Sequence, residues 1–230
     1  MNFTLSSLNN VLLQMPRCNS AMVGFSGGMD SVVLLHSLAQ LRSSGHLNFQ
    51  LRAIHVNHGL NQKADAWQQH CELICQELAV ELVCAKVHVE RSDSGNDRSS
   101  ENAARSARYR AFVQHLGANE VLLSAHHRDD QVETLLLRLN RGAGSRGLAG
   151  IPRSRPLAES FLYRPLLEFD RSELQRYAQR QKLHWIEDDS NEDLRFRRAG
   201  PRSRLRRTAM ATCCAARRRR WARVHAMCCR

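Results

Sequence analysis

Short apolar runs alternate with stretches of helical apolar periodicity along most of the chain. The runs are typical of buried strands, and the stretches between them place apolar residues on one helical face. Strands that alternate with helices of 10 to 17 residues form βαβ units and a parallel sheet. The sequence therefore predicts an α/β fold with a doubly wound, mostly parallel sheet of the Rossmann type. We expect strands over 21–25, 51–56, 81–89, 121–125 and 162–167, and helices over 30–40, 64–78, 100–116, 130–139 and 171–182.

A segment rich in glycine and proline precedes the last predicted strand, which itself contains a further proline. The segment 142–156 contains four glycines and two prolines, which predicts a loop. Pro165 lacks a backbone N–H and therefore either places the strand over 162–167 at an edge of the sheet or ends it.

The net charge of +12 comes entirely from the end of the chain. Residues 1–196 hold 22 Lys and Arg and 22 Asp and Glu, whereas residues 197–230 hold 12 Arg and no acidic residue. This tail is open to three interpretations: a solvated basic arm that contacts phosphates, a folded helical appendage, or an out-of-frame reading of a GC-rich gene. We favour the third. The chain then divides into a catalytic domain over 1–196 and an Arg-rich tail over 197–230 that is disordered or out of frame.

Composition places the chain in the cytoplasm. No segment approaches the roughly 20 apolar residues that span a bilayer, so we expect no membrane partner. The N-terminus lacks the basic and apolar regions of a signal peptide. The eight cysteines form no disulfide or metal framework, and Cys71 and Cys75 share one helical face that we expect to be core.

A glycine-rich turn follows the first predicted strand and precedes a helix. It consists of Ser26, Gly27, Gly28, Met29, Asp30 and Ser31. The glycines let the backbone approach an anion closely, the serines add donors, and the helix points its N-terminal amides at the same place. Asp30 fits an anion site if it holds Mg²⁺ against pyrophosphate oxygens. The alternative is a turn that only caps the helix.

Polar residues also follow the second and fourth predicted strands, at the sheet edge where ligands bind in such folds. Asn57 and His58 line a nucleotide pocket or belong to a polar loop without ligand; zinc is disfavoured because no Cys or His partner has suitable spacing. His127 precedes Asp129, Asp130 and Glu133 at a helix start. These acids either only stabilise the helix dipole or bind a cationic substrate, hold metal or move protons.

The turn over 26–31 resembles the PP-loop of N-type ATP pyrophosphatases, which cleave ATP between the α and β phosphates and adenylate a carbonyl oxygen. Further segments, in order and spacing over roughly 18–196, resemble the tRNA(Ile)-lysidine synthase family. They are 55–60 (HVNHGL), 101–109 (ENAARSARY), 125–134 (AHHRDDQVET), 138–148 (RLNRGAGSRGL) and 185–191 (WIEDDSN). The resemblance implies an adenine nucleotide alpha hydrolase-like fold.

Members of that family use ATP to adenylate the C2 carbonyl oxygen of the wobble cytidine in tRNA(Ile) with a CAU anticodon. L-Lysine then displaces AMP, and the lysidine formed changes decoding from AUG to AUA. The resemblance implies that Ser26 to Ser31 bind ATP, with Asp30 holding Mg²⁺, and that Asp30, His127 and Asp130 are catalytic. It also implies that Asp129 and Glu133 hold metal or the lysine ammonium. Arg105 and Arg108 either reach phosphate or are solvated, and a homodimer is one possible assembly.

The resemblance stops near Phe196, where the family continues with an R-N-x-x-R segment and domains that grip tRNA. We therefore expect adenylation with weak or absent tRNA modification. Three alternatives remain. One is a tRNA thiolase, which would carry a Cys-x-x-Cys pair that this sequence lacks. Another is a small-molecule amidotransferase, which needs an ammonia source. The last is a non-catalytic RNA-binding remnant that uses the Arg-rich tail.

Overall fold

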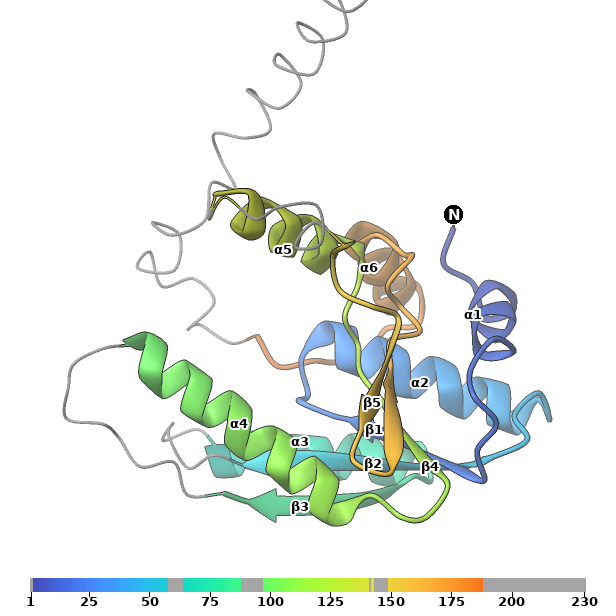
Figure 1. Cartoon of the computed structure of the whole chain (residues 1–230). Helices are drawn as coiled ribbons and strands as arrows, with labels where there is room; N and C mark the ends of the chain where they lie inside the picture. The colour runs from blue at the N-terminus through green and yellow to red at the C-terminus, as the bar shows by residue number, and fades with distance from the viewer. Residues whose placement is uncertain (1, 58–63, 88–96, 141, 143–148, 188–230) are drawn as a thin grey trace, which may run out of the picture. The chain divides into compact units, whose positions relative to one another are not determined.

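In the described part of the chain, six strands form one sheet in the order β3-β2-β1-β4-β6-β5 (Figure 1). The computed structural model describes residues 2–57, 64–87, 97–140, 142 and 149–187, so His58 and the Arg-rich tail lie outside the described residues. Neighbouring strands pair in parallel except β5 and β6, which are antiparallel. The predicted α/β class with a mostly parallel sheet is confirmed. The strands are β1 (Ser20–Gly24), β2 (Gln50–Asn57), β3 (Glu81–Lys86), β4 (Glu120–Leu123), β5 (Ser154–Leu157) and β6 (Ser160–Tyr163).

The described helices include one that the sequence analysis does not predict. The short helix α1 begins after Thr4, whose side chain accepts a hydrogen bond from the Ser7 amide while Ser7 reaches back to the Thr4 amide. This reciprocal pair is a capping box, which fixes the start of a helix. The helices are α1 (Leu5–Leu12), α2 (Met29–Ser43), α3 (Ala64–Glu77), α4 (Asp97–His115), α5 (Arg128–Asn140) and α6 (Arg171–Arg180).

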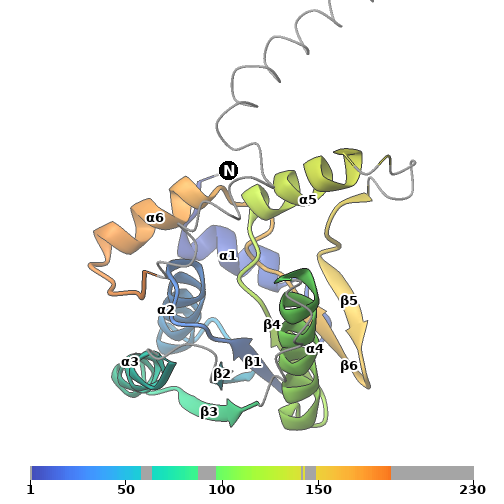
Figure 2. The same cartoon turned by 90° about the vertical axis from the view of Figure 1, so that its left-hand side faces the viewer.

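Both faces of the sheet are covered, because side chains alternate between the faces along each strand. Ala21 and Val23 of β1 belong to a core shared with α1, α2, α3 and α6. Met22, between them, belongs to a second core with Phe112 of α4. Figures 1 and 2 accordingly show α4 on the opposite side of the strands from α2. Helix α5 has no buried residue.

The segment expected to be a loop contains a strand. Ser154–Leu157 forms β5, which pairs with β6 so that Pro156 lies opposite Phe161. An edge strand tolerates a proline because one of its sides has no ladder hydrogen bonds to lose. The strand predicted over 162–167 is β6, and it ends at Tyr163, before Pro165. Pro165 therefore ends the strand, which was one of its two expected effects.

Two smaller expectations can be compared with the described residues. Cys71 and Cys75 are 0% and 1% exposed, so the prediction that they are core is confirmed. None of the helices that the structure describes is both long and apolar enough to cross a membrane.

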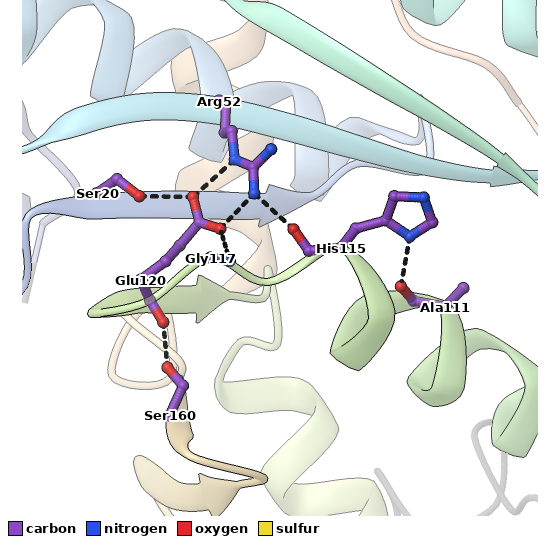
Figure 3. Close-up of polar contacts among 7 residues, drawn as sticks. All are labelled: Ser20, Arg52, Ala111, His115, Gly117, Glu120 and Ser160. Carbon is purple, nitrogen blue, oxygen red and sulfur yellow. Dashed lines mark hydrogen bonds and ion pairs between the residues drawn. The ribbon is translucent and has the colours of Figure 1, made fainter.

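A buried ion pair joins the strands at the amino-terminal edge of the sheet (Figure 3). Glu120, the first residue of β4, is 1% exposed and accepts hydrogen bonds from Ser20 (2.6 Å), Arg52 (2.7 and 2.5 Å) and the Gly117 amide (2.8 Å). Burial acts to raise the pKa of Glu120, but these hydrogen bonds outweigh it and lower the pKa. We call Glu120, Arg52, Ser20 and Gly117 the Glu120 network. It ties β1, β2 and β4 together away from the carboxyl ends of the strands.

Candidate functional site

The turn between β1 and α2 lies at the carboxyl edge of the sheet. Gly27 adopts a positive φ of 79°, a left-handed conformation that favours glycine. Ser31 donates a hydrogen bond to the Gly28 carbonyl (2.8 Å), and its hydroxyl lies 3.1 Å from that of Ser26. Gly28 is the N-cap of α2 and supplies no side-chain acceptor to the first amides of the helix. Those amides and the Ser26 hydroxyl are donors suited to a phosphate group, and the Ser31 hydroxyl can join them by giving up its hydrogen bond to Gly28.

Residues that are distant in the sequence pack against the turn. The Ile186 amide donates a hydrogen bond to the Gly27 carbonyl (2.9 Å). A Cβ on Gly27 would lie 2.6 Å from Cδ1 of Ile186 and 2.9 Å from the sulfur of Cys71. His55, which is buried, approaches the Phe25 carbonyl with Nδ1 at 3.0 Å. Only glycine therefore fits at position 27, and the chain near Ile186 fixes its backbone.

Three predicted catalytic residues come together beside this turn. Nε2 of His127 lies 3.5 Å from Oδ2 of Asp30, and its Nδ1 lies 3.6 Å from Oδ2 of Asp130. Asp130 also accepts a hydrogen bond from the His127 amide (2.9 Å), which fixes the start of α5. Arg171 of α6 lies 3.8 Å from Oδ2 of Asp30, a neighbour that the sequence analysis misses. The His127 imidazole thus bridges the carboxylates of two helix starts.

Comparison with known proteins assigns this arrangement to a family. A family model described as the PP-loop domain matches residues 4–211, which is most of the chain. The chain belongs to the PP-loop family. We use the name PP-loop for the turn over 26–31, which resembles that motif in the sequence.

Several curated relatives bear one name. The chain is 49% identical over 185 residues to a tRNA(Ile)-lysidine synthase of Photorhabdus laumondii, covering 80% of this chain and 41% of that protein. It is 54% identical over 176 residues to one of Pseudomonas aeruginosa, covering 76% of this chain and 38% of that protein. The chain thus spans about two fifths of the length of these relatives.

A solved structure shares the fold at much lower identity. The U34-tRNA thiolase NcsA from Methanococcus maripaludis aligns with a TM-score of 0.63 at 19% identity, covering 80% of this chain and 64% of that chain. At this level of identity the likeness concerns the fold alone. It agrees with the predicted adenine nucleotide alpha hydrolase-like architecture.

The two adjacent histidines beside the PP-loop favour opposite charge states. Burial acts to lower the pKa of His127, but the neighbouring carboxylates of Asp30, Asp130 and Asp129 outweigh it and raise the pKa. Burial lowers the pKa of His126 to about 4, because the opposing attraction of Asp130 is too weak. The carboxylates therefore favour the protonated form of His127, whereas burial favours the neutral form of His126.

Asp30 has the chemistry of a magnesium ligand. Its Oδ1 atom is buried and has no hydrogen-bond partner among the described residues. Mg²⁺ is usually bound by one or two carboxylates together with substrate phosphates rather than by an all-protein cage. The described part of the chain contains no group of three or more His, Cys, Asp or Glu that could hold a metal. The residues present fit a metal whose other ligands come from a nucleotide.

The remaining predicted site residues lie farther from this centre or face solvent. Asn57 is buried, and its side-chain nitrogen lies 3.2 Å from both Asp65 and Gln68 of α3. That contact ties β2 to α3, and His58 beside it lies outside the described residues. Other predicted site residues are exposed on helices: Asp129 and Glu133 on α5, and Arg105 and Arg108 on α4.

Proposed function

We propose that the chain carries the ATP-cleaving, adenylate-forming chemistry of tRNA(Ile)-lysidine synthesis. Its substrates are ATP, tRNA(Ile) with a CAU anticodon and L-lysine, and the product is lysidine at the wobble position. The observation that carries the proposal is the PP-loop with Asp30 placed against His127 and Asp130. The choice of substrate is based on the tRNA(Ile)-lysidine synthases that match three quarters or more of this chain at about 50% identity.

The first step joins the nucleotide to the base. The O2 atom of cytidine attacks the α phosphorus of ATP, an O–P bond forms, and the bond to pyrophosphate breaks. Amides at the start of α2 and the hydroxyls of Ser26 and Ser31 stabilise the departing pyrophosphate, because they are donors at a helix N-terminus. Asp30 would hold Mg²⁺, which neutralises phosphate charge when bound.

The second step replaces the activated oxygen with an amine. The lysine nitrogen attacks C2, a C–N bond forms, and the C–O bond to AMP breaks. The attacking ammonium must first lose a proton, and we assign its acceptance to the carboxylate of Asp130, which lies beside the His127 imidazole. Asp129 and Glu133, exposed on the same helix, would attract the ammonium by their charge.

The domain division bears on tRNA binding. We assign the catalytic domain to residues 1–196, which have no net charge, and regard the Arg-rich tail as outside it. Because clustered positive charge supplies most nonspecific affinity for RNA, the domain should bind tRNA weakly at physiological salt. We propose a cytoplasmic protein and leave the homodimer as one possible assembly.

Pyrophosphate release tests the proposal. The full chain is incubated with ATP, magnesium and tRNA(Ile) transcript, with and without lysine, and compared with Asp30→Asn. We expect release that depends on the transcript and falls at least about 100-fold in Asp30→Asn. Glu159→Gln, an exposed acid in the turn between β5 and β6, is the control for loss of one charge. Equal release by wild type and Asp30→Asn, or release that free cytidine supports as well as tRNA, contradicts the proposal.

A further inference from the structure

Three arginines gather around Tyr109 of α4. The guanidinium carbons of Arg155, on β5, and Arg105, on α4, lie 4.7 and 5.2 Å from the centre of the Tyr109 ring. Arg164, the residue that follows β6, is only 3% exposed. We call Arg105, Arg155 and Arg164 the arginine cluster.

The arginine cluster has no acidic partner among the described residues: none of the three arginines forms an ion pair with a carboxylate there. The Arg164 guanidinium donates hydrogen bonds to the Pro152 carbonyl (2.6 Å) and to the Tyr109 side chain, neither of which is a carboxylate. The Nε atoms of Arg155 and Arg164 are buried and have no hydrogen-bond partner within the described part of the chain. Burying a charge without compensation is costly, so this arrangement is most readily explained by an anion that completes it.

The three charges act on one another and on the residues beside the PP-loop. Burial lowers the pKa of Arg164, and the like charges of Arg155 and Arg105 add to this effect, although Tyr109 opposes it. Arg164 and Arg105 also contribute to the low pKa of His126, after burial. The positive potential of the arginine cluster therefore reaches the histidine next to His127.

The strand order explains this proximity. Strand β4 pairs in parallel with β1 on one side and with β6 on the other. The PP-loop follows β1, His126 and His127 follow β4, and Arg164 follows β6. The Ser124 amide donates to the Tyr163 carbonyl (3.0 Å), which holds the ends of β4 and β6 together. The arginine cluster and the PP-loop thus flank the histidines at the same edge of the sheet.

We propose that the arginine cluster binds a phosphodiester of the RNA substrate and so holds the strand next to the reacting base. The inference rests on the proposed function. Guanidinium groups suit this role, because their planar donor forks match phosphate oxygens. The nucleotide phosphates have a separate set of donors in the PP-loop, across β4. A local cluster is also what a domain without net charge needs to position RNA.

Salt-dependent RNA binding tests the assignment. The probe is a fluorescent RNA stem–loop with the CAU anticodon, titrated with the full chain, Arg155→Gln and Arg180→Gln at several salt concentrations. Arg180 is exposed on α6, so its variant loses the same charge away from the cluster. We expect Arg155→Gln to weaken binding about tenfold and to reduce the slope of log K against log salt by about 0.7 to 1. Arg180→Gln should leave both unchanged, and the Arg-rich tail is common to all three proteins.

ATP binding, measured on the same proteins without RNA, separates the possible outcomes. Unchanged ATP affinity in Arg155→Gln together with the lower salt slope supports the proposal. Loss of ATP affinity with unchanged RNA binding would mean that the cluster binds nucleotide phosphates, which overturns the proposal. A salt slope for Arg155→Gln equal to that of wild type would overturn it as well. Arg105→Gln, at an exposed position, is the second variant if Arg155→Gln does not fold. Failure of the Asp30→Asn test leaves this measurement intact, so the two proposals can fail separately.

Discussion

The two edges of the sheet use buried polar groups in opposite ways. At the amino-terminal edge, both carboxylate oxygens of Glu120 accept hydrogen bonds (Figure 3). At the carboxyl edge, buried polar side-chain atoms of Asp30, His127, Arg155 and Arg164 have no hydrogen-bond partner among the described residues. These are four of the seven such residues found in the described part of the chain. Satisfied buried groups add stability, whereas unsatisfied ones cost stability and are expected where a ligand binds.

This contrast follows from the topology. In a parallel sheet the carboxyl ends of the strands lead into loops and helix starts, which present amides and acids to a ligand. The amino-terminal ends receive the chain from the helices, and here they carry the Glu120 network. Substitutions at the amino-terminal edge should therefore mainly lower stability, whereas substitutions at the carboxyl edge should mainly lower activity.

The largest expected effect is on stability, at the amino-terminal edge. Glu120→Ala leaves Arg52 without its buried partner and should lower the free energy of unfolding by about 3–5 kcal/mol. Urea titration followed by circular dichroism measures the loss, and Glu159→Ala, at an exposed acid, is the control. Pyrophosphate release per folded molecule should stay within about twofold of wild type. A loss of activity without a loss of stability would mean that the Glu120 network also serves the chemistry.

The next effect is on activity, at the carboxyl edge. Asp30→Ala should lower pyrophosphate release by about 10² to 10³, as expected when one charged group of a preorganised site is lost. Its free energy of unfolding should change by less than about 1 kcal/mol. Among the described residues, one buried oxygen of this carboxylate has no hydrogen-bond partner, and the ion pairs to His127 and Arg171 are long. Thermal melting and release are measured on the same sample. A fall in melting temperature as large as that of Glu120→Ala would contradict the idea that the carboxyl edge serves activity rather than stability.

The sequence predicted the positions of most helices and strands and the residues that meet at the carboxyl edge of the sheet, but it did not predict the contacts that support them. The helix and strand positions followed from apolar periodicity, and the meeting of Asp30 with His127 followed from the shared edge of parallel strands. Helix α1 was missed although Thr4 and Ser7 form its capping box, with Leu8 and Leu12 one turn apart on its buried face. That signal was available at the sequence level.

Other features could not be predicted because they depend on tertiary contacts between distant residues. Nothing near Ile186 in the sequence indicates that its amide holds Gly27. Arg155 lies in the segment that was expected to be a loop, and Arg164 in the strand expected over 162–167, and arginines are mostly exposed in proteins. Only the antiparallel pairing of β5 with β6 brings them to Tyr109. Periodicity places residues on faces of an element, but it does not identify which elements meet.

A smaller effect is expected where Ile186 supports the PP-loop. Gly27→Ala should destabilise the fold by about 1–2 kcal/mol for the positive φ, with a further cost for the contact to Ile186. Gly45→Ala is a matched control, because Gly45 has a φ of 70° and open space around its Cβ position. The difference between the losses of unfolding free energy in Gly27→Ala and Gly45→Ala measures the steric conflict with Ile186. Adding Ile186→Ala to Gly27→Ala should reduce this difference. KM for ATP should rise in Gly27→Ala and not in Gly45→Ala, whereas equal costs with unchanged KM contradict a supporting role for Ile186.

The smallest expected effect is the pH dependence of the Glu120 network. Hydrogen bonds from Arg52, Gly117 and Ser20 outweigh burial and lower the pKa of Glu120 in the folded state. Its charge therefore contributes stability that is fully present above the unfolded pKa, about 4.3, and is lost as pH falls through the lower folded value. The difference in unfolding free energy between wild type and Glu120→Gln should be constant from pH 7 to about 5 and narrow below about 4. Urea titrations at each pH measure it. A difference that stays constant down to pH 3 would show that the carboxylate stabilises the edge by packing, and the contrast between the edges would then rest on shape rather than on charge.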